Sequence, residues 1–109
     1  MRVWDIEPNR LCRKHLLGEH REIHAIWSVI TKNKKGYSNH PETIRWKGKL
    51  NALYIRHEKI AIEMKTRGYN HKSELDKRNA RGRKNQDVFV NSISEQVQIL
   101  KSKKCDCKV

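Results

Sequence analysis

The stretch that decides the fold runs from His15 to His24, HLLGEHREIH, where ionisable residues interrupt an apolar helical pattern. At 3.6 residues per turn, His15, Glu19 and Glu22 follow one line of a helix. Apolar side chains repeat beside this line at helical spacing: Leu16, Ile23, Ile26, Trp27 and Ile30. The polar line therefore borders a buried face, where partial desolvation is expected to raise the pKa of a carboxylate. Glu22, next to Arg21, is the better candidate for an acid or base.

Two further helices are expected around this first one, which should span about residues 10–31 with a bend near Gly18. A second helix begins at Pro41, has an irregular start around Gly48 and ends at Gly68. With 109 residues, the chain is long enough for one compact domain with a modest core. The sequence thus predicts an all-α single domain over residues 1–109.

The last third of the chain combines a basic loop with a third helix. Ser92 and Glu95 form a capping box at the start of this helix, and Ile93, Val97 and Leu100 are expected to be buried. Residues 69–87 are rich in Lys and Arg, which fits either a disordered solvated linker or a loop that follows DNA phosphates. The tail, about 104–109, is expected to fray.

Charge is the strongest compositional signal. The 25 Lys and Arg residues against 12 Asp and Glu give a net charge of +13, so nucleic acid is the expected partner. Membrane-surface binding is the weaker alternative, because the apolar faces are committed to a core. No run is long enough to cross a membrane and the first residues lack a signal peptide, so we expect a cytoplasmic protein, nucleoid-associated or viral.

The three cysteines, Cys12, Cys105 and Cys107, do not form the disulfide framework of a secreted protein, because their number is odd and two are one residue apart. They are consistent with a reducing compartment. The pair Cys105 and Cys107, joined by Cys12 or a histidine, can be interpreted as a metal site, but a lone C-x-C lacks the paired spacing of zinc ligands. We therefore expect free thiols in a basic tail, with no metal and no cofactor.

Three interpretations of the opening stretch compete. His20 and His24 lie one turn apart, as in a zinc protease helix, but that motif needs a glutamate where Arg21 stands. A solvated helix face explains surface histidines and acids, but not why three ionisable residues line up beside the core. The third interpretation rests on a resemblance.

Residues His15 to Glu22 resemble the H-L-x-x-E-x-R-E motif of the phage endonuclease V family, the pyrimidine-dimer DNA glycosylase/AP lyases. Arg2-Val3 is similar to the family's Arg-Ile, and Leu50 to Arg56 together with Lys65 to Asn70 resemble its second helix. The resemblance implies three helices in one compact domain, with the N-terminal arm beside the first helix. It also implies double-stranded damaged DNA as the partner of a monomeric enzyme.

The resemblance implies that the α-amino group of Met1 is the nucleophile and that Glu22 is the essential acid or base. Phage members expose a threonine before their arginine, whereas here Arg2 follows Met1 directly, so Met1 takes the threonine's register. The implied reaction removes damaged pyrimidines, most simply pyrimidine dimers, through a Schiff base and then cleaves the strand by β-elimination. The alternatives are a lyase for abasic sites or another damaged base, and a non-catalytic nucleic-acid-binding protein.

Candidate DNA contacts follow from the same positions. Arg2 and Arg21 flank the proposed site and suit phosphate or sugar. His15 is either a site residue or a buried anchor for the arm. His24 stands beside Ala25, which occupies the place of the family's second arginine, and is expected to substitute in part. Backbone contacts are expected from seven further residues, Lys32, Lys34, Lys35, Arg78, Arg81, Arg83 and Lys84.

The tail holds no aromatic residue that could stack on a base. Stacking partners are therefore expected among Trp4, Trp46 and Tyr69.

Overall fold

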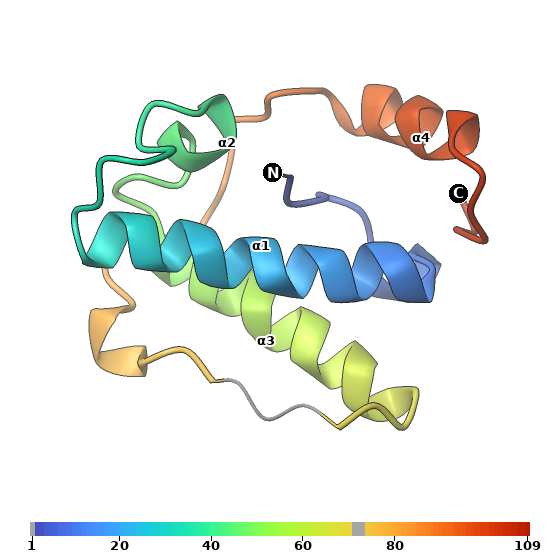
Figure 1. Ribbon diagram of the computed structural model, residues 1–109, viewed down its shortest axis with the longest axis horizontal. Helices are drawn as coiled ribbons and strands as arrows, with labels where there is room; N and C mark the ends of the chain where they lie inside the picture. The colour runs from blue at the N-terminus through green and yellow to red at the C-terminus, as the bar shows by residue number, and fades with distance from the viewer. Residues whose placement is uncertain (1, 71–73) are drawn as a thin grey trace.

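The computed structural model describes residues 2–70 and 74–109, and these residues form helices without a β-strand (Figure 1). Four α-helices and two short 3₁₀ helices follow one another: η1 (Pro8–Arg10), α1 (Arg13–Thr31), α2 (Pro41–Ile44), α3 (Leu50–Thr66), η2 (Lys77–Asn79) and α4 (Ile93–Ser102). The molecule measures 35 × 29 × 24 Å. The predicted all-α class is confirmed, with α1, α3 and α4 as the main helices.

The core forms between α1 and α3, which pack against each other and run in roughly opposite directions (Figure 1). The predicted stripe of α1 is buried, since Leu16, Ile23 and Ile26 are fully enclosed. Gly18 does not bend α1, which continues through it as regular helix. No helix among the described residues is long and apolar enough to span a membrane.

Both long helices end in a residue with positive φ that satisfies the last carbonyl groups. After α3, Gly68 has φ 81°, and the next N–H, that of Tyr69, bonds to the Met64 carbonyl at 2.8 Å. After α1, Asn33 takes the same role with φ 50°. This is the Schellman arrangement, which explains why the predicted stop at Gly68 is correct.

The predicted second helix is in fact two. His40 caps α2 by accepting the Glu42 N–H on its ring nitrogen, and Pro41 provides the first turn, as expected. The helix ends after four residues and residues 45–49 form a turn with Gly48 at φ 74°. This turn aims two large side chains inward, Arg45 and Trp46, which are almost fully buried.

The basic loop after α3 returns to the start of that helix. The N–H groups of Asn51 and Ala52 donate to the carbonyls of Arg81 and Arg83, at 2.8 and 3.0 Å. First-turn N–H groups have no partner within their own helix, so the loop backbone caps α3. A side chain at Gly82 (φ 85°) would overlap the Gly48 carbonyl, which is why glycine is needed there.

The third predicted helix, α4, begins with the expected capping box of Ser92 and Glu95. Its buried stripe differs from the prediction, because Ile93 is 48% exposed whereas Gln96 is 2% exposed. The Gln96 amide bonds both the backbone and the carboxylate of Asp5, so the polar residue is drawn inside by the N-terminal arm.

Candidate active site

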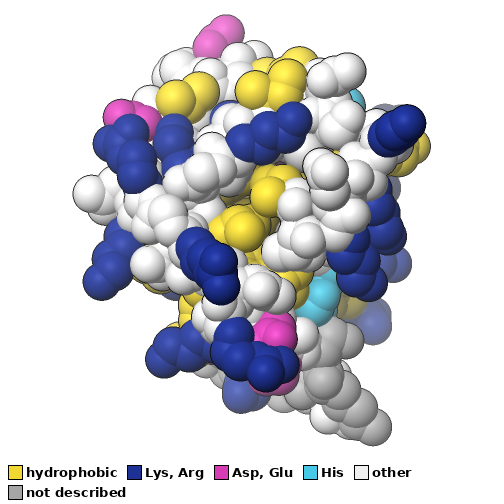
Figure 2. All heavy atoms as spheres, turned by 90° about the vertical axis from the view of Figure 1, so that its left-hand side faces the viewer, with side chains coloured by type: hydrophobic (Ala, Val, Ile, Leu, Met, Phe, Trp, Pro, Cys, Tyr) yellow, Lys and Arg dark blue, Asp and Glu magenta, His cyan; other side chains and the backbone are white. Residues whose placement is uncertain are grey.

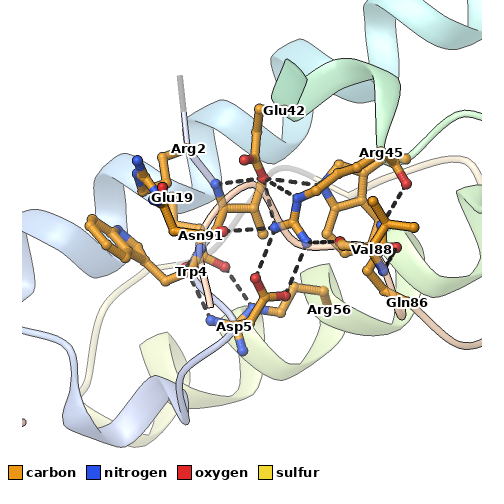
Figure 3. Close-up of polar contacts among 12 residues, drawn as sticks. Arg2, Trp4, Asp5, Glu19, Glu42, Arg45, Arg56, Gln86, Val88 and Asn91 are labelled. Atoms are coloured by element: carbon orange, nitrogen blue, oxygen red, sulfur yellow. Dashed lines mark hydrogen bonds and ion pairs between the residues drawn. The ribbon is translucent and has the colours of Figure 1, made fainter. Parts of the chain in front are cut away.

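The N-terminal arm, residues 2–7, lies along α1 on the side of α4 and is held by two buried carboxylates (Figures 1 and 3). The Trp4 N–H donates to Glu19 Oε1 of α1 at 3.0 Å. The Val3 N–H donates to Glu42 Oε1 of α2 at 3.1 Å. An extended segment has unpaired backbone N–H groups, so these carboxylates supply partners that a sheet would otherwise provide. They fix the register of the arm.

Glu19 is the carboxylate that burial affects most. It is 1% exposed, and burial raises its pKa, while the facing Arg56 opposes the rise. Arg56 of α3 binds it in a fork, with Nε–H and a terminal N–H donating at 2.7 and 3.0 Å. The expected border carboxylate of raised pKa is therefore Glu19, which has a structural role.

Glu42 is matched by Arg45, whose guanidinium lies at the centre of Figure 3. Arg45 donates to Glu42 Oε1 at 2.8 Å and to the Val3 carbonyl at 2.9 Å. It also pairs with Asp5 at 3.1 Å. Sequence reasoning missed the roles of Arg45 and Arg56, because Val3 and Glu19, which they bind, lie 42 and 37 positions earlier in the chain.

A cavity of about 560 Å³ opens beside the arm and brings together several predicted site residues, Arg2, His15, Arg21 and Glu22. The half-buried Glu22 carboxylate makes no hydrogen bond or ion pair with any described residue. Arg2 lies over the Trp4 ring at 5.1 Å and donates to Asn91 at 2.9 Å. A carboxylate without a partner among the described residues, in a cavity that two arginines also line, is available to a bound molecule.

His15 lines the same cavity but is engaged by its neighbours. Its Nδ1 lies 3.2 Å from the Cys12 sulfur and 3.1 Å from the Cys107 sulfur. The ring meets Trp4 edge-on at 5.8 Å. Burial, followed by the charges of two nearby lysines, lowers the pKa of His15. These contacts match the anchoring alternative for this residue.

His24 is not brought to the cavity. Its Nε2 lies 3.2 Å from Nε2 of the buried His57, so its ring faces α3. His20 packs against both rings, with centroids 4.6 Å from His24 and 5.1 Å from His57.

The tail forms the far wall of the cavity through Lys103, Lys104 and Cys105. The expected fraying does not occur at its end, because the Lys108 N–H donates to the Arg10 carbonyl at 2.7 Å. The Cys107 sulfur accepts the Cys12 N–H at 3.1 Å. Two cavity lysines were thus missed by the sequence analysis, which treated the tail as solvated.

The other predicted cations lie at the opposite end of α1, where Figure 2 shows many basic and few acidic side chains. Lys32, Lys34 and Lys35 are exposed just after α1. Arg78 is paired with Asp76 and Arg83 with Asp87, whereas Arg81 and Lys84 make no ion pair with a described residue. Eleven residues separate Arg21 from Lys32, about 16 Å of helix or roughly five base pairs of duplex.

The expected stacking residues are mostly unavailable. Trp4 and Trp46 are 5% and 2% exposed, because both belong to the core. Tyr69 is half-buried and faces the Arg13 guanidinium at 5.7 Å. The exposed aromatic side chains are instead Tyr37 and Phe89.

A family model for pyrimidine dimer DNA glycosylases matches residues 1–77, which include the arm, α1 and α3. The chain belongs to this family. The predicted relationship is therefore confirmed. Membership of this family makes the protein a DNA glycosylase, whose substrate is DNA. Comparisons with curated proteins and with solved structures give no match.

The structure describes only one of the two predicted catalytic residues. Glu22 lies at the cavity, whereas Met1 lies outside the described residues. Its covalent neighbour Arg2 lines the cavity together with Glu22.

Proposed function

We propose that the protein is a DNA glycosylase with AP lyase activity that removes pyrimidine dimers from double-stranded DNA and acts as a monomer. The single observation that carries the proposal is the cavity that Arg2, Arg21 and Glu22 line together. Its arginines suit the phosphates on both sides of a lesion. The arm leads to this cavity, so its terminal amine is the natural nucleophile.

The α-amine of Met1 suits this chemistry because of its acidity. An α-amino group has a pKa of about 8 against about 10.4 for lysine, so roughly a tenth is free base at pH 7. Its lone pair attacks the sugar C1′, and the C1′–N bond to the base breaks. The base takes the electron pair and a proton, and in a dimer it stays joined to the neighbouring pyrimidine through the cyclobutane ring. Ring opening then gives a protonated Schiff base between Met1 and C1′.

Glu22 has two tasks in the proposed reaction. Its carboxylate stabilises the positive charge that develops on the sugar as the base departs. It then accepts and returns protons as the Schiff base forms. Loss of a proton from C2′ then breaks the C3′–O bond, which cleaves the strand, and the phosphate leaves as the 5′-phosphate end of the downstream strand.

The basic surface supplies affinity without sequence preference. Lys103 and Lys104 on the cavity wall, and the exposed lysines after α1, are proposed to contact phosphates on either side of the lesion. Each such contact releases counterions, so affinity should fall steeply as salt rises. His15 and His24 serve as packing residues in this proposal.

The test compares cleavage of duplexes that contain a cyclobutane pyrimidine dimer, an abasic site or no lesion. Wild-type protein is expected to cleave the first two. Glu22→Gln should lower cleavage by at least about 100-fold and leave binding within a few-fold, because only the transition state needs the charge. Glu63→Gln, a substitution in an ion pair away from the cavity, is the matched control.

Three outcomes separate the alternatives. Cleavage at the abasic site alone indicates a lyase without the glycosylase step on dimers. Binding without cleavage of any duplex indicates a non-catalytic protein. Equal activity of Glu22→Gln and wild type contradicts the assigned role of Glu22.

A further inference from the structure

Three cysteines and one histidine meet where the tail crosses the start of α1. One ligand atom from each of Cys12, His15, Cys105 and Cys107 lies within 4.8 Å of all the others. The His15 nitrogen is 3.2 and 3.1 Å from two of the sulfurs. Tetrahedral zinc with ordinary bond lengths separates sulfur from nitrogen by about 3.6 Å, and two sulfurs by about 3.8 Å. The cluster therefore needs only small adjustments to enclose an ion.

We propose that these four residues bind one Zn²⁺ as a structural Cys₃His site that fastens the tail to α1. Thiolates with an imidazole are the ligands that zinc prefers. Four protein ligands leave no open position, so the ion stabilises the fold and takes no part in cleavage. Binding releases the protons of three thiols to solvent, which gives a centre of net charge −1.

The surroundings of the cluster suit bound thiolates. The Cys12 N–H already donates to the Cys107 sulfur at 3.1 Å, a contact that also orients ligands in metal sites. Cys12 is the residue directly before α1, where the positive end of the helix dipole favours negative charge. Lys14 and Lys103 add positive charge close to His15.

The backbone holds the tail in place for this role. The Lys108 N–H bonds to the Arg10 carbonyl at 2.7 Å, and the Arg10 side chain returns a bond to the Lys108 carbonyl at 3.1 Å. All four ligand residues are partly buried, so water does not surround the sulfurs. The short C-x-C spacing, which looked insufficient in the sequence, is completed by two residues about 90 positions earlier.

Two other uses of these residues are less consistent with the structure. A disulfide would join two of the sulfurs and would not account for the third thiol and the imidazole in the same cluster. A second cluster, His20, His24 and His57, also has metal-ligand spacing. Its rings already satisfy one another, because His57 lies 3.2 Å from His24 and 3.0 Å from the Glu58 carboxylate.

The site would add a further attachment to a segment that is rich in charged residues. Part of α4 is joined to the arm by Gln96, but four of the last seven residues are charged, and only Cys107 and Val109 among these seven pack against the core. A small domain gains stability from a metal where its core is limited. The ion also fixes Lys103 and Lys104 on the cavity wall.

The test measures zinc in the full-length protein, purified without chelators, by inductively coupled plasma mass spectrometry. We expect one zinc per chain in wild type and in His20→Gln, which removes a residue of the second cluster. Cys107→Ser should lower zinc affinity by at least about 100-fold. Wild type reconstituted with Co²⁺ should show the visible bands of tetrahedral cobalt and intense thiolate-to-cobalt charge transfer, so the conclusion does not depend on the folding of the cysteine variant.

Four results would overturn the proposal. The first is wild-type protein that contains no zinc and gives no tetrahedral cobalt spectrum, and the second is a cobalt spectrum without thiolate charge transfer. The third is loss of zinc in His20→Gln together with retention of zinc in Cys107→Ser. The fourth is a disulfide among the three cysteines under reducing conditions. None of these readouts depends on DNA cleavage.

Discussion

The two ends of the chain reach the same cavity but are held in different ways. The arm is fixed by hydrogen bonds from its backbone to Glu19 and Glu42, each of which is buried and paired with an arginine. The tail is held by partly exposed groups and by sulfur atoms. The arm's position therefore depends on buried pairs of carboxylate and arginine, whereas the tail's position depends on backbone hydrogen bonds and on contacts of its sulfur atoms.

Removal of one arginine from the arm's support should have the largest effect. Arg56→Met leaves Glu19 buried without its counter-charge, and the free energy of unfolding at pH 7 should fall by about 3–5 kcal/mol. Urea denaturation measures the change. Arg78→Gln, which breaks an exposed pair with Asp76, is the control and should leave the urea midpoint unchanged. Similar losses in both variants would show that the buried pair does not hold the arm.

A lower pH should restore part of the stability that Arg56→Met loses. Burial raises the pKa of Glu19 in the folded protein. A carboxyl group whose pKa is higher in the folded than in the unfolded protein stabilises the fold when it is protonated. This stabilisation is complete below the pKa of the unfolded state, about 4.3, and is lost as pH rises through the pKa of the folded state. Without Arg56 the rise is larger, so Arg56→Met should be less destabilised at pH 5 than at pH 7. A loss that is the same at both pH values would mean that the carboxylate is solvated.

The tail should produce the smallest effect, and only on DNA binding. Replacing Lys103 and Lys104 by Gln removes two cavity-wall charges without touching the core. The plot of log affinity against log salt should become shallower by about 1.8, or about 0.9 for each phosphate contact. Fluorescence anisotropy with a lesion duplex measures this slope. Lys101→Gln, on α4 and outside the cavity lining, is the control. An equal change of slope in this variant would show that the cavity-wall lysines have no special part in DNA binding.

The sequence could predict features that depend on neighbouring residues, but not contacts between residues far apart in the chain. The stripe Leu16, Ile23 and Ile26 and the stop at Gly68 depend on residues close in the chain, and the structure has both. The Arg56 partner of Glu19 is 37 residues away, and its role depends on how α1 crosses α3. Local patterns carry no information on such a crossing.

The same reason explains the tail. Cys12 and Cys107 are 95 residues apart, so C-x-C looked like an incomplete motif until the fold joined them. Gln96 was missed because its partner is Asp5 at the other end of the chain. Ile93 was wrongly placed in the core because helical periodicity cannot show which face of α4 meets the arm.

The most direct test of the proposed mechanism is borohydride trapping with abasic-site DNA, followed by mass spectrometry of the cross-linked peptide. Reduction turns the Schiff base into a stable amine, so the nucleophile keeps its sugar remnant. We expect one covalent complex per chain, with the remnant on the α-amine of Met1. A remnant on Lys103 or Lys104, the lysines of the tail wall, or no complex at all, would contradict it.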